Sequence, residues 1–176
     1  VFQDYALFPH LNVFENGKLE TINREKDKFE RVFDTGDKIY ISRRGRGLFS
    51  FRDKTLLSIP STKIFKTKKQ SIICVFKTER GLILVTRQSG VFSLERGVVT
   101  QIEIPNKTFS KTTVFAGIQL ENGGYAIGST DGLFLFDQEL NITSHVATDT
   151  GLQDNFVRSV HQDFQGNIWL GLNDGI

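Results

Sequence analysis

Cationic side chains are concentrated in two segments of the chain. Three arginines lie within residues 43–46, and four lysines lie within residues 63–69. Arginine guanidinium groups form paired hydrogen bonds with carboxylates and sulfates. One interpretation is a binding site for an anionic ligand, such as an acidic or sulfated oligosaccharide, and the other is a solvated basic loop surface without a ligand. The candidate ligand-binding residues are Arg43, Arg44, Arg46, Lys66, Lys68 and Arg87.

Other residue types that carry chemistry show no recognisable catalytic or metal-binding pattern. The three histidines, His10, His145 and His161, do not have the spacing of metal ligands. No Ser-His-Asp order, phosphate-binding loop or Cys-His pair is recognisable. The acidic residues stand in turns, where such side chains commonly bond their own backbone. The sequence therefore predicts a chain that is not an enzyme, with no cofactor and no bound metal.

The composition is that of an ordinary soluble globular protein. The chain has 176 residues, of which 39% are hydrophobic and 24% charged, and its net charge is only +2. This small charge, with basic residues that do not alternate with aromatic ones, argues against a nucleic-acid partner. No run of about 18 apolar residues is present, so no insertion into a membrane is expected. The single cysteine, Cys74, lies in an apolar run and is expected to be a buried strand residue.

A repeat with a period of 42 or 43 residues positions the candidate binding residues. Its clearest mark is a glycine followed by an apolar residue, at Gly47, Gly90, Gly132 and Gly175, which are 43, 42 and 43 residues apart. Each unit contains four short apolar segments separated by turn residues, a spacing typical of antiparallel β-meanders. A β-sandwich gives no reason for a strict period of this length, whereas each four-stranded blade of a β-propeller is one repeat.

The sequence thus predicts an all-β fold, a β-propeller segment of four-stranded antiparallel blades that amounts to about four blades. The predicted blades span residues 29–60, 71–104 and 113–146, with partial blades over residues 1–22 and 156–176. Gly81, Gly123 and Gly166 are expected at positive φ in the turns between first and second strands. The first residue, Val1, and the incomplete last repeat indicate a piece of a longer propeller. The alternative is that strands from the two partial blades join and close a four-bladed ring.

The order of the strands sorts the loops onto two faces. In an antiparallel blade, the turn between the second and third strands and the crossing to the next blade lie on one face. The other two turns lie on the opposite face. The candidate cations all fall on the first face, across two neighbouring blades. Acidic residues gather on the opposite face: Asp34, Asp37, Glu79, Glu95, Glu121, Asp137, Glu139 and Asp163.

Residues 151–176 carry the most specific motif in the chain. The motif consists of Gly151-Leu152, Asn155, Val157, Asp163, Gly166, Ile168-Trp169, Gly171 and Gly175-Ile176. This pattern resembles the two-component-regulator propeller repeat, and weaker copies surround the three earlier periodic glycines. The resemblance implies a seven-bladed propeller in the periplasmic sensor region of a bacterial membrane protein, such as a hybrid histidine kinase or a diguanylate cyclase. It also implies carbohydrate sensing and a packing role for Trp169.

The resulting functional hypothesis is a non-catalytic segment of a two-component sensor that binds an oligosaccharide. Its other partners would be the remaining blades of the same propeller or a second protomer. Two alternatives stay open. A propeller scaffold that binds a protein without a small ligand would be favoured by an exposed apolar patch on the loop face. A glycan hydrolase would need two carboxylates facing each other in a cleft.

Overall fold

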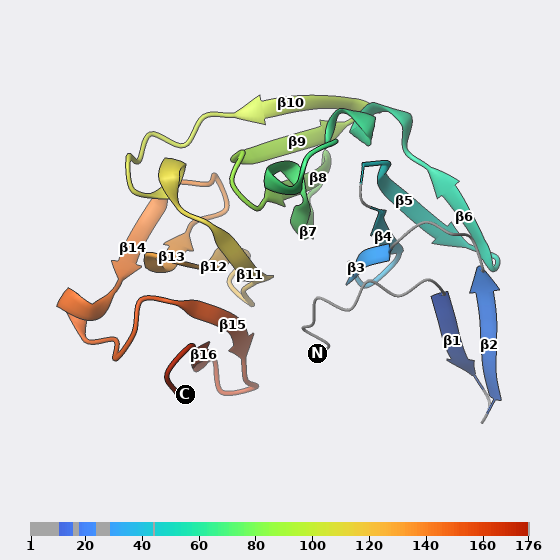
Figure 1. Cartoon of the computed structure of the whole chain (residues 1–176). Coiled ribbons are helices and arrows are strands. Elements are labelled where there is room, and N and C mark those ends of the chain that lie inside the picture. The colour runs from blue at the N-terminus through green and yellow to red at the C-terminus, as the bar shows by residue number, and fades with distance from the viewer. Residues whose placement is uncertain (1–10, 16–17, 24–28, 44, 176) are drawn as a thin grey trace.

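The structure is an open arc of β-sheets arranged like the blades of a fan (Figure 1). This computed structural model describes residues 11–15, 18–23, 29–43 and 45–175. Within these residues, three four-stranded antiparallel sheets, here called blades 1, 2 and 3, lie between a two-stranded amino-terminal hairpin and a two-stranded carboxyl-terminal hairpin. The predicted all-β propeller architecture is confirmed. No helix in this part of the chain is both long enough and apolar enough to cross a membrane.

Each blade runs in chain order from an inner strand to an outer strand (Figure 1). Blade 1 comprises β3 (Phe29–Asp34), β4 (Ile39–Arg43), β5 (Gly47–Arg52) and β6 (Thr55–Ser58). Blade 2 comprises β7 (Ile72–Lys77), β8 (Gly81–Thr86), β9 (Val91–Glu95) and β10 (Val98–Ile102). Blade 3 comprises β11 (Val114–Gln119), β12 (Tyr125–Ser129), β13 (Gly132–Phe136) and β14 (Ile142–Val146).

The remaining elements are two hairpins and four short 3-10 helices. The hairpins are β1 (Leu11–Glu15) with β2 (Lys18–Asn23), and β15 (Val157–Gln162) with β16 (Ile168–Leu172). The 3-10 helices are η1 (Pro60–Ile64), η2 (Lys68–Gln70), η3 (Phe109–Lys111) and η4 (Thr148–Thr150), all in crossings between sheets. Leu140 has a φ of +68° and lies in the turn before β14.

Burial between neighbouring sheets explains why β7 is apolar along nearly its whole length. Its first five side chains are all buried. Ile72 and Val75 pack in a cluster with blade 1, whereas Ile73 and Phe76 pack in a cluster with blade 3. Cys74 is buried in the second cluster, as predicted, and burial raises the pKa of its thiol to about 12. A strand covered on both faces has no polar side, so its apolar pattern is continuous.

Gly47 allows the crossing after blade 1 to pack directly against β5. Its φ of +83° and its contact with the backbone of Thr62 leave no room for a Cβ atom. Thr62 is fully buried, and its Oγ1 atom accepts a hydrogen bond from Leu48 N (2.7 Å) and donates one to Ile59 O (2.7 Å). The periodic glycine therefore marks a point where the blade and its outgoing crossing meet.

The prediction of positive φ was wrong at Gly81 and confirmed at Gly123 and Gly166, where φ is +84° at both. Gly81 begins β8 in an extended conformation. A Cβ atom there would meet the carbonyl oxygen of Leu94 on β9. At Gly81 the missing side chain thus permits a close approach of two strands and not a left-handed turn.

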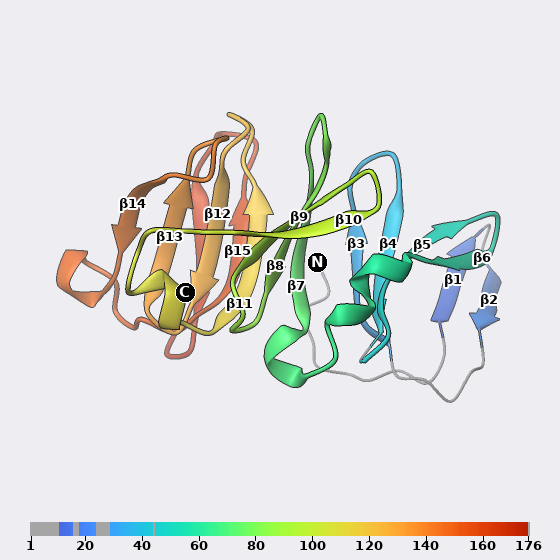
Figure 2. The same cartoon turned by 90° about the horizontal axis from the view of Figure 1, so that it is seen from above.

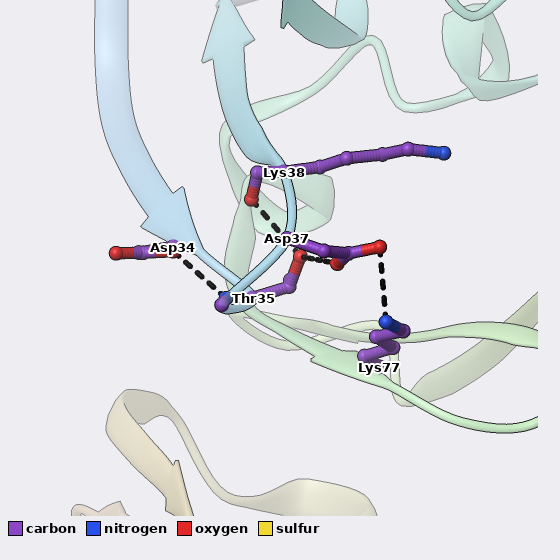
Figure 3. A network of polar contacts seen from close by, with 6 residues as sticks. Asp34, Thr35, Asp37, Lys38 and Lys77 are labelled. Atoms are coloured by element: carbon purple, nitrogen blue, oxygen red, sulfur yellow. Dashed lines mark hydrogen bonds and ion pairs between the residues drawn. The ribbon is translucent and has the colours of Figure 1, made fainter.

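An ion pair joins blades 1 and 2 at the turns between their first and second strands (Figure 3). Lys77 Nζ lies 2.9 Å from Asp37 Oδ2, and Thr35 Oγ1 donates a hydrogen bond to Asp37 Oδ1 (3.2 Å). The hydrogen bond from Lys77 is the main reason that the pKa of Asp37 lies below its ordinary value. Both side chains are about half exposed, so this pair contributes orientation more than stability.

The two hairpins do not join into one sheet among the described residues. β1 pairs only with β2, and β15 pairs only with β16. Figure 1 places the two hairpins at opposite ends of the arc. The alternative of a four-bladed ring closed by strands from both partial blades is therefore not what the structure shows.

Gly47→Ala is expected to lower the free energy of unfolding by about 3 kcal/mol, because the new Cβ atom adds backbone strain and a clash with Thr62. Gly36→Ala is the matched control, since φ there is +85° but nothing lies within 4 Å of an added Cβ atom. The control should lose only about 1 kcal/mol. Chemical denaturation of both variants and the parent measures the difference, and equal losses would contradict a role for the close approach.

Candidate functional site

One face of the arc carries the connections between blades, and we call it the crossing face. It consists of the turns between second and third strands and the crossings that lead to the next inner strand. Strand register brings these ends together: Thr86 pairs with Ile72, and Ile102 pairs with Val91. Figure 2 shows the green and yellow 3-10 helices at the lower ends of the strands, on this face, with the β7–β8 turn at the upper end.

Arg43 lies at the end of β4 and is only 5% exposed. Its guanidinium carbon stands 4.8 Å from the ring centre of Phe29 and 5.0 Å from that of Phe49. A guanidinium group over an aromatic face is stabilised electrostatically, more strongly where water is excluded. The structure thus buries most of the Arg43 side chain against aromatic rings of blade 1.

The other candidate cations are spread along the crossing face. Arg46 and Lys66 are exposed, and Arg87 is half-buried. Lys68 is the first residue of η2, but its side chain and the whole of Arg44 lie outside the described residues. The cavities beside Arg43 and Arg87 measure about 10 Å³ each, room for a water molecule and no more. A binding role for these cations stays a prediction.

The turn at residues 87–89 connects three parts of the crossing face. Arg87 N donates to Ser71 O (2.9 Å), and Arg87 O accepts from Val114 N (2.8 Å). Gln88 N donates to Lys69 O (2.9 Å), and Gln88 Nε2 donates to Thr113 Oγ1 (2.7 Å). A turn of blade 2 is therefore bonded both to the crossing that enters its own blade and to the start of blade 3.

A groove of about 530 Å³ opens on the crossing face beside this turn. Its walls are the turn itself, the end of β10 and the crossing that leads to η3. This volume lies in the range of small-molecule binding sites. The polar side chains that line the groove are Gln88, Ser89, Gln101, Glu103, Asn106, Lys107 and Ser110.

Sequence reasoning missed the groove because it sorted only charged residues onto the two faces. Gln88 and Gln101 are uncharged and 13 residues apart. The pairing of Ile102 with Val91 brings the end of β10 next to the turn before β9. A search for amide side chains at strand ends on the crossing face would have pointed to the groove.

The described residues form no cluster of metal ligands, and the groove lacks the two carboxylates that a glycan hydrolase needs. No group of three or more His, Cys, Asp or Glu side chains among the described residues could bind a metal ion. His145 stacks on Phe134, and its Nε2 atom lies 2.6 Å from Asp131 O, whereas His161 is exposed on β15. Glu103 is the one carboxylate that lines the groove, and glycoside hydrolysis needs two.

Asp163 organises the turn of the carboxyl-terminal hairpin. Its Oδ1 atom accepts hydrogen bonds from Gln165 N (2.9 Å) and Asn167 N (2.9 Å). Its Oδ2 atom accepts from Trp169 Nε1 (2.8 Å) and Asn167 Nδ2 (3.0 Å). These bonds, that from Trp169 first, lower the pKa of Asp163 to about 2. The predicted role of Asp163 as a turn residue that bonds its own backbone is confirmed.

Comparison with known proteins supplies the family of this hairpin. Residues 151–174 match the family model described as two component regulator propeller. The chain carries a two-component regulator propeller repeat. The resemblance that the sequence predicted is thereby confirmed at the segment that carried it. No curated protein is similar to this chain at a significant level.

Solved propeller structures share the fold at low sequence identity. The extracellular domain of BT4673 from B. thetaiotaomicron superposes with a TM-score of 0.69 and 17% identity over 95% of this chain and 24% of that one. The extracellular domain of BT3049 from the same organism, assigned as a hybrid two component system, superposes with a TM-score of 0.62. Its identity is 23% over 82% of this chain and 19% of that one. The WD40 β-propeller domain of Doa1 superposes with a TM-score of 0.73 and 12% identity over 99% of this chain and 60% of that one. The chain thus spans about a quarter or less of the two bacterial domains.

Arg43→Ala is expected to lower the free energy of unfolding by about 2 kcal/mol, because two rings lose their buried cationic partner. Arg46→Ala, its neighbour on the same turn, is exposed and should change stability by no more than about 0.5 kcal/mol. Urea denaturation of both variants measures the contrast. A loss for Arg46→Ala as large as that for Arg43→Ala would contradict the assignment of Arg43 to the blade interior.

The hydrogen bond between Trp169 and Asp163 should survive to unusually low pH. Because the folded pKa of Asp163 is about 2, below its unfolded value, the bond stabilises the fold fully above the unfolded pKa and is lost as pH falls through about 2. Trp169 is the only tryptophan, so its indole N–H signal is assigned without ambiguity and responds to this bond. Asp163→Asn should move the signal at neutral pH and abolish its acid titration, whereas Glu139→Gln should do neither. A midpoint near pH 4 in the parent would contradict the structure.

Proposed function

We propose that this chain is a segment of the extracytoplasmic ligand-sensing propeller of a bacterial two-component signalling protein. The observation that carries the proposal is the two-component regulator propeller repeat at residues 151–174, packed on blade 3 of a propeller fold. The similarity to extracellular domains of BT4673 and BT3049 supports a location outside the cytoplasm, which would be the periplasm.

The segment itself would bind and not catalyse. The groove on the crossing face has a single lining carboxylate, Glu103, and neither a histidine nor a cysteine lines it. Cys74 is fully buried, and burial raises the pKa of its thiol, which keeps it unreactive. The signal output would come from a histidine kinase or cyclase domain elsewhere in the full-length protein.

The proposed ligand is an oligosaccharide bound on the crossing face. A ligand there would contact the loops that connect adjacent blades, because the turn at residues 87–89 is bonded to residues 69–71 and 113–114. It would therefore favour one packing of neighbouring blades, or of paired propellers, over another. A ligand can shift such an equilibrium only by its difference in affinity for the two arrangements, and loops shared between blades would provide that difference.

Acidic groups of the ligand are assigned to the exposed cations of the crossing before blade 2. Lys63, Lys66 and Lys69 lie in this crossing, and Arg46 lies in the neighbouring turn of blade 1. All four are exposed, so pairing with a carboxylate or sulfate carries only a small desolvation cost. Their like charge would also raise the association rate of an anionic chain at low salt.

A scaffold that docks a protein partner has less support. Large exposed apolar side chains occur on several elements, with Val32 on β3, Leu57 on β6 and Val98 on β10. Three more, Phe156, Phe164 and Trp169, lie at different levels of the last hairpin and the segment that enters it. Single exposed apolar side chains are common on protein surfaces and do not by themselves mark an interface. A ligand-sized groove on the crossing face is more typical of a small-ligand site.

Binding of acidic and neutral oligosaccharides to the chain, measured by calorimetry, tests the proposal. The parent should bind at least one class. The double variant Arg46→Ala, Lys66→Ala should weaken binding of acidic chains about tenfold and reduce its salt dependence. Arg80→Ala, Arg96→Ala is the charge-matched control, because both residues lie in turns on the opposite face, and it should bind like the parent. A parent that binds no oligosaccharide would refute the sensing proposal.

A further inference from the structure

The groove between the edge of blade 2 and the crossing into blade 3 is lined by three amide side chains, and hydrogen bonds hold two of them in place. Asn106 Oδ1 accepts a hydrogen bond from Phe109 N (2.8 Å), which fixes the orientation of its amide group. Gln88 Nε2 is bound to Thr113 Oγ1 (2.7 Å), which leaves its Oε1 atom as an acceptor. Gln101 Nε2 reaches Ser89 O at 3.5 Å, a weak contact that a ligand can replace.

The charge of the groove is balanced, unlike that of the neighbouring cationic loops. Glu103 and Lys107 are its two charged lining residues, and their charges are opposite. The remaining polar groups are amides and hydroxyls, each of which both donates and accepts hydrogen bonds. This set matches sugar hydroxyl groups, which also donate and accept, and offers no excess charge for a carboxylate or sulfate.

The wall of the groove is rigid because Phe109 anchors it in the core. Phe109 is 5% exposed, and its ring meets those of Phe134 and Phe136 edge to face, at 5.2 and 5.1 Å between ring centres. Half-buried Ile102 and Ile104 pack against the same cluster from the end of β10. Their apolar surface can pack against the C–H faces of sugar rings, and a preformed wall loses little entropy on binding.

We infer that this groove is a subsite for an uncharged, hydroxyl-rich section of the ligand, bound by Gln88, Gln101 and Asn106. The inference rests on the proposed sensing function, but it places the ligand at the junction of blades 2 and 3. The cations predicted from the sequence lie in blades 1 and 2 and in the crossing between them. A neutral oligosaccharide bound here would contact the end of β10, the turn of blade 2 and the crossing into blade 3 at once.

Calorimetry with short neutral glucan, xylan, mannan and arabinan oligosaccharides tests the subsite. Gln101→Ala removes a lining amide from an exposed position, and it should weaken binding of the neutral chains about tenfold. Ser110→Trp should fill the groove and abolish that binding. The matched controls are Gln119→Ala and Ser144→Trp, the same changes at exposed positions outside the groove lining, and both should bind like the parent. Thermal unfolding shows whether each variant is folded. If Ser110→Trp does not fold, the result for Gln101→Ala alone decides the test.

The outcomes separate this inference from the proposed function. Loss of neutral binding in the groove variants, with no effect of Arg46→Ala, Lys66→Ala on the same chains, supports the subsite. Neutral binding that survives in both groove variants overturns the subsite and leaves the sensing function intact. Binding of acidic polygalacturonate or chondroitin sulfate oligosaccharides only would also overturn it. A parent that binds neither class refutes both proposals.

Discussion

Burial of apolar sheet faces between neighbouring blades is the constraint on which the rest of the structure depends. β7 has its first five side chains buried, and it divides them between blade 1 and blade 3. Each fully buried aliphatic or aromatic side chain contributes roughly 1.5–3 kcal/mol relative to exposure. No blade can bury both of its faces alone, so blades must stack. The stacking then determines where every crossing and turn lies, including those that could meet a ligand.

The crossing face follows from that stacking. A crossing must leave an outer strand and return to the centre of the arc, and it passes over its neighbours on the way. Thr62 pins one such crossing to β5, and Phe109 inserts another into the cluster between blades 2 and 3. The groove exists because the second crossing runs out beyond β10 before η3 brings it back (Figure 1). A ligand held there would touch the same segments that hold adjacent blades together, which links binding to blade packing.

The blades could be predicted from the sequence because their repeat has a strict mechanical cause. Gly47, Gly90 and Gly132 all adopt positive φ at the entry to a third strand, and few other residues tolerate that conformation. The role of Arg43 could not be predicted in this way. Its charge indicated a surface, but its position at the end of β4 places it between Phe29 and Phe49. The groove escaped prediction for a related reason, since Gln88 and Gln101 line the same groove only through the register of β9 and β10. The spacing of residues along the chain predicts where strands lie, but it does not predict which way an individual side chain points.

Hydrogen–deuterium exchange of the chain, with and without the oligosaccharide it binds most tightly, tests the central claim most directly. The claim is that the ligand is sensed on the crossing face, by loops shared between blades. Added protection is expected at residues 87–90 and 101–114, with no change in the turns at residues 121–124 and 137–141 on the opposite face. Protection confined to the opposite face, or spread evenly over all blades, would contradict the account.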